Sequence, residues 1–324
     1  MSSRVLSSIP KFSAFEKNNT LEGLVGSYAE LVISEIYESY KGIVLYLVNS
    51  TLEGQESFSN LKFFNPAIEV ELFPDWEILP YDRLSPHVKI VSQRIATLNR
   101  LVRFKKGVII LPVKAALYKL PPREWVTQNT FDVKAGGETE IKDLRLKLLS
   151  LGYVEKRQVF DVGNVAFRGS VVDIYPIGSS HPVRLDFFDN RIDSIRQFDA
   201  ETQRSTDEIS IATILPAKEY PSNDSSLIKF KRNWRLAFGH ENTDSPFYHS
   251  LAAQIIPAGI EHYLSFFYDK LEEFYQYIKD PFITVYSKNV FDREADFKEQ
   301  TQTRYHELTS LNERPILQKN KILT

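Results

Sequence analysis

The stretch 165–199, VAFRGSVVDIYPIGSSHPVRLDFFDNRIDSIRQFD, constrains the fold more than any other part of this chain. It is rich in β-branched and aromatic residues, and turn signals interrupt it at Pro176–Gly178, Ser179–Pro182 and Asp189–Asn190. Short runs separated by such turns are typical of consecutive antiparallel strands. The sequence therefore predicts an antiparallel sheet in the middle of the chain.

Within this stretch, the hexapeptide VRLDFF divides its side chains between the two faces of a strand. One face is apolar and suits a core: Val183, Leu185 and Phe187. The other carries a cation, an anion and an aromatic ring: Arg184, Asp186 and Phe188. Arginine and aromatic side chains are enriched among the anchors of protein interfaces, which favours a docking surface. The alternative is that Phe188 covers the edge of a core while Arg184 and Asp186 pair across strands. The spacing alone leaves both open.

The first third of the chain alternates helices with buried strands. Apolar runs predict strands at 43–48, 68–73 and 108–113, and apolar periodicity predicts helices at 27–40 and 88–103. Residues 51–60 are compatible with a helix or a turn. Such alternation implies an α/β unit with a parallel sheet. Residues 1–20 are polar and are expected to be loosely held.

The middle of the chain predicts a second unit inserted into the first. Pro121–Pro122 is interpreted as a linker, and it is followed by a strand at 131–136, a helix near 140–151 and the antiparallel strands up to Phe198. This is an α+β pattern. The apolar run 209–216 is then expected to lead back to the first unit.

The last third is predicted to be mostly helical, with helices at 225–238, 247–255, 265–278 and 289–310. One strand at 282–287 is expected to complete the first sheet. Five aromatic residues are expected to gather in a core: Tyr263, Phe266, Phe267, Tyr275 and Tyr277. The expected domains are therefore 1–121, 122–212 and 213–324, of which the first and last form one folded unit.

Charge and residue usage exclude several classes of function. The 324 residues include 40 basic and 42 acidic side chains, so the chain as a whole has no electrostatic footprint for nucleic acid. Without cysteine it has no thiol nucleophile and no thiolate metal site, and its six histidines lie far apart. No apolar run is long enough to span a bilayer, and no secretion signal is evident, so a cytoplasmic location is expected.

The segment GLVGSYAE lies where a nucleotide-binding loop would precede the first helix. On the template G-x-x-G-x-G-K-S/T, two glycines match, Gly23 and Gly26. The third glycine, the lysine and the hydroxyl residue are replaced by Tyr28, Ala29 and Glu30. The lysine would neutralise phosphate charge and the hydroxyl would hold Mg²⁺, whereas a carboxylate would repel phosphate. We therefore expect no nucleotide hydrolysis by this chain, and we expect it to hold neither catalytic residues nor a metal ion.

Several long strings resemble a known family: FPDWEILPYDRLSPH, FRGSVVDIYPIG, VRLDFFDNRIDSIRQFDAETQRS, ILPAKEYP and IPAGIEHYLSFFY. Together they are similar to the bacterial transcription-repair coupling factors, from about Leu21 to near the C-terminus. The resemblance implies the N-terminal module of such a factor. Its full-length members continue into an RNA-polymerase-binding domain and an ATP- and Mg-dependent translocase motor on double-stranded DNA, neither of which is expected in this chain.

This module is in turn similar to the excision-repair protein UvrB. The resemblance implies a degenerate RecA-like, P-loop-like parallel-sheet domain, split into segments 1a and 1b, with an inserted α+β domain 2. It also implies that the insert docks onto UvrA and that the C-terminal part of the full-length protein masks this surface. No cofactor is implied for this segment.

The positions that contact UvrA in the family correspond to three residues here: Arg168, Arg184 and Phe188. Asp186 matches an acidic position used in UvrB. UvrB carries a further basic residue where this chain has Ala166, so the implied docking surface is less basic than that of UvrB. Arg168 is expected on a strand beside the other residues.

Two functions remain open at this point: a UvrA-docking module without catalysis, and a divergent UvrB-like, ATP-dependent enzyme that recognises DNA damage. Titration with ATP and Mg²⁺ separates them. We expect neither heat of binding nor a rise in melting temperature, because the phosphate-binding lysine is replaced by Ala29. Saturable stabilisation by ATP and Mg²⁺ would favour the enzyme.

Overall fold

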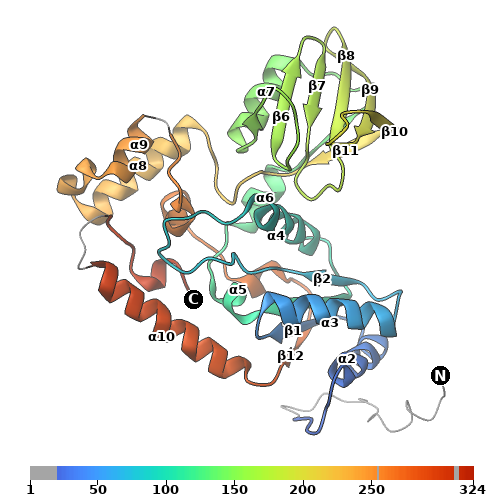
Figure 1. Ribbon diagram of the computed structural model, residues 1–324, viewed down its shortest axis with the longest axis vertical. Helices are drawn as coiled ribbons and strands as arrows, with labels where there is room; N and C mark the ends of the chain where they lie inside the picture. The colour runs from blue at the N-terminus through green and yellow to red at the C-terminus, as the bar shows by residue number, and fades with distance from the viewer. Residues whose placement is uncertain (1–19, 254, 310–313) are drawn as a thin grey trace. The chain divides into compact units, whose positions relative to one another are not determined.

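The computed structural model describes residues 20–253, 255–309 and 314–324 (Figure 1). The loosely held segment predicted at 1–20 lies, apart from its last residue, outside the described residues. The chain groups into two compact units, each built from distant parts of the sequence. The first unit comprises residues up to 75, 103–116 and 278–295; the second comprises 76–102, 117–277 and 296–324. The expected division at residues 121 and 212 stays a prediction.

A four-stranded parallel sheet forms the centre of the first unit, in the order β12-β1-β3-β2. Its strands are β1 (Ile43–Val48), β2 (Val70–Leu72), β3 (Gly107–Pro112) and β12 (Phe282–Tyr286). The two central strands are almost wholly buried, which is why their sequences are continuous apolar runs. β12 pairs in parallel with β1, so the predicted completion of this sheet by residues 282–287 is confirmed.

Helices α2 (Tyr28–Ser39) and α3 (Thr51–Phe64) belong to the same unit. The ambiguous segment 51–60 is thus a helix, and its first turn is capped because the Ser50 side chain accepts a hydrogen bond from the Glu53 amide. Gly54 lets α3 approach the sheet, since a Cβ there would lie 2.9 Å from Leu72 Cδ1.

The inserted sheet in the second unit has six strands, in the order β10-β9-β8-β7-β6-β5. They are β5 (Val154–Glu155), β6 (Asn164–Arg168), β7 (Val171–Ile174), β8 (Val183–Phe188), β9 (Arg191–Phe198) and β10 (Ser205–Ile209). Every pairing from β6 to β10 is antiparallel, as predicted. Helix α7 (Ile141–Ser150) lies along one face (Figure 1) and buries Leu144 and Leu148 in the core of this sheet.

The predicted return of residues 209–216 to the first unit is wrong. β11 (Ile211–Ile214) instead pairs antiparallel with β4 (Phe131–Lys134). Alternate residues of β11 are buried, and Ala212 and Ile214 pack into the same core as α7. A strand with one apolar face suits such a ribbon on the insert, whereas a strand of the parallel sheet would be buried on both faces.

The rest of the second unit is helical but less regular than predicted. Its helices are α4 (Val88–Leu101), α6 (Arg123–Gln128), α8 (Asp224–Phe238), α9 (Pro246–Ala252) and the greater part of α10 (Val290–Thr309), and α5 (Val113–Leu117) leads into it. Short 3₁₀ turns connect them: η1 (His240–Asp244), η2 (Ile260–Phe266), η3 (Phe274–Tyr277) and η4 (Lys319–Lys321). Within the described ranges, every helix is too short or too polar to cross a lipid bilayer.

The predicted helix at 265–278 is wrong. Phe266, Phe267 and Tyr268 are consecutive and all buried, and three consecutive side chains cannot share one face of a helix. The segment forms 3₁₀ turns and a β-bridge between Glu272 and Leu120 instead. The predicted aromatic core is confirmed for Tyr263, Phe266 and Phe267. Tyr277 is buried outside that cluster, and Tyr275 is half exposed.

The predicted linker at Pro121–Pro122 is a packed segment. The Tyr277 hydroxyl donates to Pro121 O at 2.5 Å, and the Leu120 amide donates to Glu272 O at 2.8 Å. Two prolines in sequence favour an extended chain but do not say what contacts it.

A buried ion pair connects three distant segments of the second unit. Arg94 Nε, from α4, donates to Glu219 Oε1 at 2.6 Å, and both side chains are almost completely buried. Trp76 Nε1 donates to the same oxygen at 3.1 Å, and the Arg94 guanidinium lies 5.1 Å from the centre of the Trp76 ring. These contacts hold three segments together: the aromatic loop after β2, helix α4, and the chain that leaves β11.

His262 provides a test of this core. Burial, reinforced by Arg314 and Arg304, lowers the pKa of His262 from 6.5 to about 3. The unfolded chain therefore binds a proton below pH 6.5 that the folded chain excludes. We expect the free energy of unfolding to fall by roughly 1.4 kcal/mol per pH unit from this residue as the pH drops from 6 to 4.

The measurement is urea unfolding of the native chain and His262→Phe between pH 7 and pH 4. The variant keeps a ring against Trp76 but cannot be protonated, so its stability should depend less steeply on pH. The carboxyl of Glu261, whose pKa is raised by burial, is common to both proteins and does not affect the comparison. Equal slopes would contradict a neutral buried His262.

Candidate protein-docking face

The side chains of β8 alternate between two environments, as the sequence predicts. Val183, Leu185 and Phe187 point into the core shared with α7. Arg184, Asp186 and Phe188 lie on the opposite face of the sheet, and Phe188 is 75% exposed. We call this opposite face, with Arg168, Asp173, Arg184, Asp186, Phe188 and Arg196, the docking face.

A buried carboxylate organises two of its arginines. Asp173 lies on β7 directly opposite Arg184, and its side chain is fully buried. Its two oxygens accept hydrogen bonds from Arg184 Nε at 2.7 Å and from Nη2 at 3.0 Å. Arg168 Nη2 donates to the same carboxylate from the other side. Asp173 therefore fixes one guanidinium in a bidentate geometry and a second beside it.

The position of Arg168 differs from the prediction in one respect. It lies on β6, so β7 separates it from Arg184 and the two are not on adjacent strands. The arginines act together only because Asp173 lies between them. Arg168 remains 43% exposed in its side chain, whereas Arg184 is 18% exposed.

Arg184 is held in place by several contacts within the fold. Its guanidinium lies 4.7 Å from the centre of the Phe198 ring, and the hydrogen bond to Asp173, with a smaller opposing effect of burial, raises its pKa. Asp186 is held in a second pair, accepting from Ser194 Oγ at 3.0 Å and from Arg196 Nη2 at 2.5 Å. Arg184 and Asp186 thus pair across strands, as the alternative interpretation of VRLDFF holds, but Phe188 is exposed and does not cover the edge of a core. Docking by this face stays a prediction.

The docking face is open at one end and covered at the other. Ala166 and Phe198 are fully buried there with Val159, and Gln203 Nε2 donates to Val159 O at 3.0 Å. Ala166, which the resemblance matches to a basic residue of UvrB, therefore lies within this small cluster. Phe188 marks the open end, beside the β8–β9 turn at Asp189–Asn190.

The segment compared with a nucleotide-binding loop lies in the first unit. Gly23 and Gly26 have φ angles of +75° and +63°, and a Cβ added at either residue would meet no other atom within 4 Å. Tyr28 and Ala29 are half-buried at the start of α2, and Glu30 is buried. The Glu30 carboxylate accepts a hydrogen bond from Ser57 Oγ at 2.7 Å. Glu30 thus has a structural partner in α3; its effect on phosphate binding stays a prediction.

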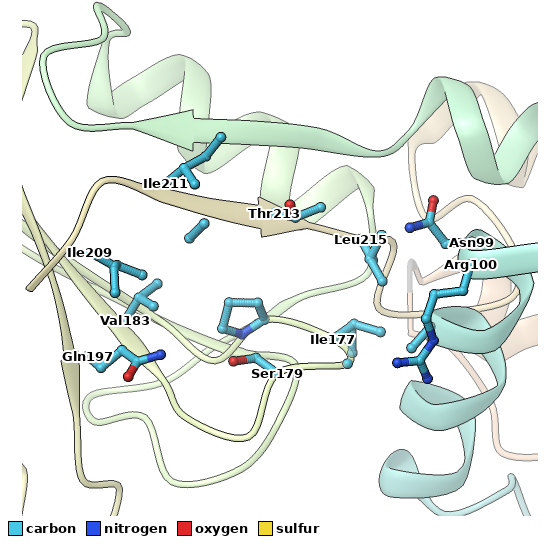
Figure 2. Close-up of a pocket in the computed structure, with 14 residues that line it drawn as sticks. Asn99, Arg100, Ile177, Ser179, Val183, Gln197, Ile209, Ile211, Thr213 and Leu215 are labelled. Carbon is cyan, nitrogen blue, oxygen red and sulfur yellow. The ribbon is translucent and has the colours of Figure 1, made fainter. Parts of the chain in front are cut away.

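A cavity of about 380 Å³ lies elsewhere in the second unit (Figure 2). Aliphatic residues form part of its walls, with Ile177, Val183, Ile209 and Leu215 among them, and Arg100 from α4 lies at one side. Polar side chains from Asn99, Ser179, Gln197 and Thr213 complete the lining. Across the described residues, no cluster of three histidine or acidic side chains could hold a metal ion.

Sequence reasoning missed two members of the docking face, Asp173 and Arg196. A signal for Asp173 was available, because an acidic residue inside the apolar strand VVDI must be paired if it is buried. Arg196 precedes Phe198 by two residues, so both point to the same face of β9. Which partners they take depends on strand register, and the sequence does not specify that register.

Comparison with known proteins gives this face a context. Residues 131–220, which include every residue of the docking face, match the family model described as the UvrB interaction domain. The chain is 34% identical over 293 residues to the transcription-repair-coupling factor of Haemophilus influenzae and 31% identical over 295 residues to that of Escherichia coli. These alignments cover 90% and 91% of this chain.

The chain is a homologue of the transcription-repair-coupling factors. A further relative, from Staphylococcus aureus, is 29% identical over 70% of the chain. The chain spans about a quarter of the length of the first two relatives, 26% in each case. The resemblance inferred from its sequence motifs is therefore confirmed, as is the presence of a UvrB interaction domain.

The role of Asp173 can be tested by stability. Asp173→Ala leaves two guanidinium groups without their buried acceptor, and we expect it to lower the free energy of unfolding by about 2–4 kcal/mol. Asp186→Ala is the matched control, because its carboxylate is partly exposed and its loss should cost less than about 1 kcal/mol. Urea unfolding at neutral pH measures both. Similar losses in the two variants would contradict the organising role of Asp173.

Proposed function

We propose that this chain is a protein-docking module that recruits UvrA in transcription-coupled nucleotide excision repair. The observation that carries the proposal is the exposed ring of Phe188 beside arginines that the fold already holds in place. The comparisons support it, because the docking face lies within a UvrB interaction domain and the relatives are named transcription-repair-coupling factors.

The physical basis is preorganisation. Binding normally costs the conformational entropy of the side chains that become ordered. Arg184 is ordered by Asp173 and Phe198 before any partner arrives. Phe188 supplies apolar surface, and the three guanidinium groups outnumber the two carboxylates by one charge. The partner that fits best presents an apolar pocket with acidic groups around it.

Within this proposal, the full-length protein couples two machineries in the cytoplasm. Its further domains would bind RNA polymerase stalled at a lesion and translocate on double-stranded DNA with ATP and Mg²⁺, and the present segment would bring UvrA to that place. The C-terminal part of the full-length protein would mask the docking face until it is needed. Each of these partners is inferred from the resemblance.

We also infer that the four-stranded parallel sheet is a RecA-like domain that has lost its nucleotide site, so the segment needs no cofactor and performs no catalysis. The burial of Glu30 against Ser57 supports this, because a carboxylate in place of the magnesium-binding hydroxyl is used to join α2 to α3. The alternative, a divergent UvrB-like ATP-dependent enzyme, has the parallel sheet and the two glycines in its favour.

Binding of purified UvrA tests the proposal. Alanine substitution of Arg168, Arg184 or Phe188 is expected to weaken binding by about 1–3 kcal/mol each, because such residues anchor interfaces. Isothermal titration or surface plasmon resonance measures the loss.

Masking is tested in the same assay, since a full-length relative should bind UvrA more weakly than this chain.

Helix α7 offers matched controls on the opposite face of the sheet. Leu146→Ala removes an exposed apolar side chain, and Arg145→Ala removes an exposed arginine that pairs with Glu155. Both variants should bind UvrA like the native chain. Two results would show that the docking face is not the contact surface. One is unchanged UvrA binding by the variant that combines all three alanine substitutions, at Arg168, Arg184 and Phe188. The other is a loss of affinity in the α7 controls equal to that in the docking-face variants.

A further inference from the structure

The outer edge of β12 carries no strand among the described residues, since β12 ends the parallel sheet of the first unit. Exposed edge strands present unpaired backbone groups, and proteins usually protect them with charged residues, proline or bulges. None of these occurs within β12, whose sequence is FITVY. Tyr286, the last residue of β12, and Phe291 of α10 are both more than half exposed, and their ring centres are 4.9 Å apart.

The hydrogen bonds to β1 identify which backbone groups of β12 point outward. Ile43 N–H donates to Pro281 O, and Ser287 N–H donates to Leu47 O at the other end of the strand. Because these groups alternate along a parallel strand, the odd-numbered residues from 281 to 287 face β1. The even-numbered residues Phe282, Thr284 and Tyr286 therefore direct their amide and carbonyl groups away from the sheet.

We propose that this edge is a self-association surface, on which the β12 strands of two copies of the chain pair antiparallel about a twofold axis at Thr284. In this register the outward-facing residues of one strand meet the outward-facing residues of the other. Thr284 pairs with Thr284 of the second copy, and Phe282 pairs with Tyr286. The two four-stranded sheets become one sheet of eight strands.

The sequence around β12 is complementary to itself in this register. Going outward from Thr284, a β-branched residue meets a β-branched residue, Ile283 with Val285, and an aromatic ring meets an aromatic ring. Such cross-strand pairs stabilise antiparallel sheets. Four residues from the axis, Asp280 lies opposite Lys288 of the second copy, so that each end of the paired strands carries one opposite-charge pair.

A second copy is therefore favoured over an unrelated strand. The aromatic, β-branched and charged positions are all symmetric about one residue, and that residue is one whose backbone groups point outward. The interface is isologous, so it closes at two copies. The inference is independent of the proposed docking to UvrA, because β12 belongs to the first unit and the docking face to the second.

Sedimentation equilibrium of this chain over a concentration series tests the proposal. We expect the average molar mass to rise with concentration toward that of two chains. Thr284→Pro removes the outward amide at the axis without removing a bond to β1, and proline is tolerated on edge strands. It should weaken the dimer about tenfold. Tyr286→Lys, which retains the β12 backbone, should do the same if the proline variant fails to fold.

Charge reversal specifies the register. Asp280→Lys or Lys288→Asp alone should weaken the dimer about threefold, and the double variant should restore it. Leu236→Lys, at an exposed apolar residue of α8 in the other unit, is the matched control and should leave the mass unchanged.

A chain that stays monomeric at every concentration overturns the proposal. So does a dimer that Thr284→Pro and Tyr286→Lys leave intact, because another surface would then form it. Failure of the double charge reversal to restore the dimer overturns the register. Concentration-independent protection of the Thr284 and Tyr286 amides from hydrogen exchange in a monomer would show that another segment of the chain occupies the edge, and would also overturn self-association.

Discussion

The buried pair of Arg94 and Glu219 is the interaction on which the second unit depends most. Two ions taken out of water cost several kcal/mol each unless hydrogen bonds satisfy them. Glu219 receives Arg94 and Trp76 on its carboxylate, and its carbonyl receives the Tyr268 hydroxyl at 3.0 Å. The chain leaving the inserted sheet is thereby attached to α4 and to the aromatic helical region. A docking surface can hold a partner in a fixed position only if its own sheet is firmly attached to the rest of its unit.

The docking face uses the same physical rule closer to solvent. Asp173 is as buried as Glu219, but its two arginines reach the surface. The buried carboxylate holds the charged groups in place while leaving part of each guanidinium available. Phe188 has no such restraint from the core and is exposed to solvent. In the first unit, by contrast, the loop glycines Gly23 and Gly26 lie in open space.

Local pattern was sufficient wherever one face or both faces of an element are buried. The continuous apolar run of β1, the apolar periodicity of residues 225–238 and the alternation of β8 all predicted their structures correctly. Local pattern was insufficient where contacts with residues distant in the sequence determine the structure. The segment 265–278 has apolar residues at helical spacing, but consecutive side chains are buried and the segment forms 3₁₀ turns. The strand at 209–216 was recognised, but its partner was not.

The sequence by itself determined the parallel and antiparallel sheets, the family and the face on which Arg184, Asp186 and Phe188 lie, because strand periodicity and long motifs are local properties. Only the tertiary structure decided that Asp173 joins Arg168 to Arg184, that Arg196 holds Asp186, and that β12 is left at an edge. These facts depend on strand order and register. Order and register are set by contacts between residues far apart in the chain, and no local pattern encodes them.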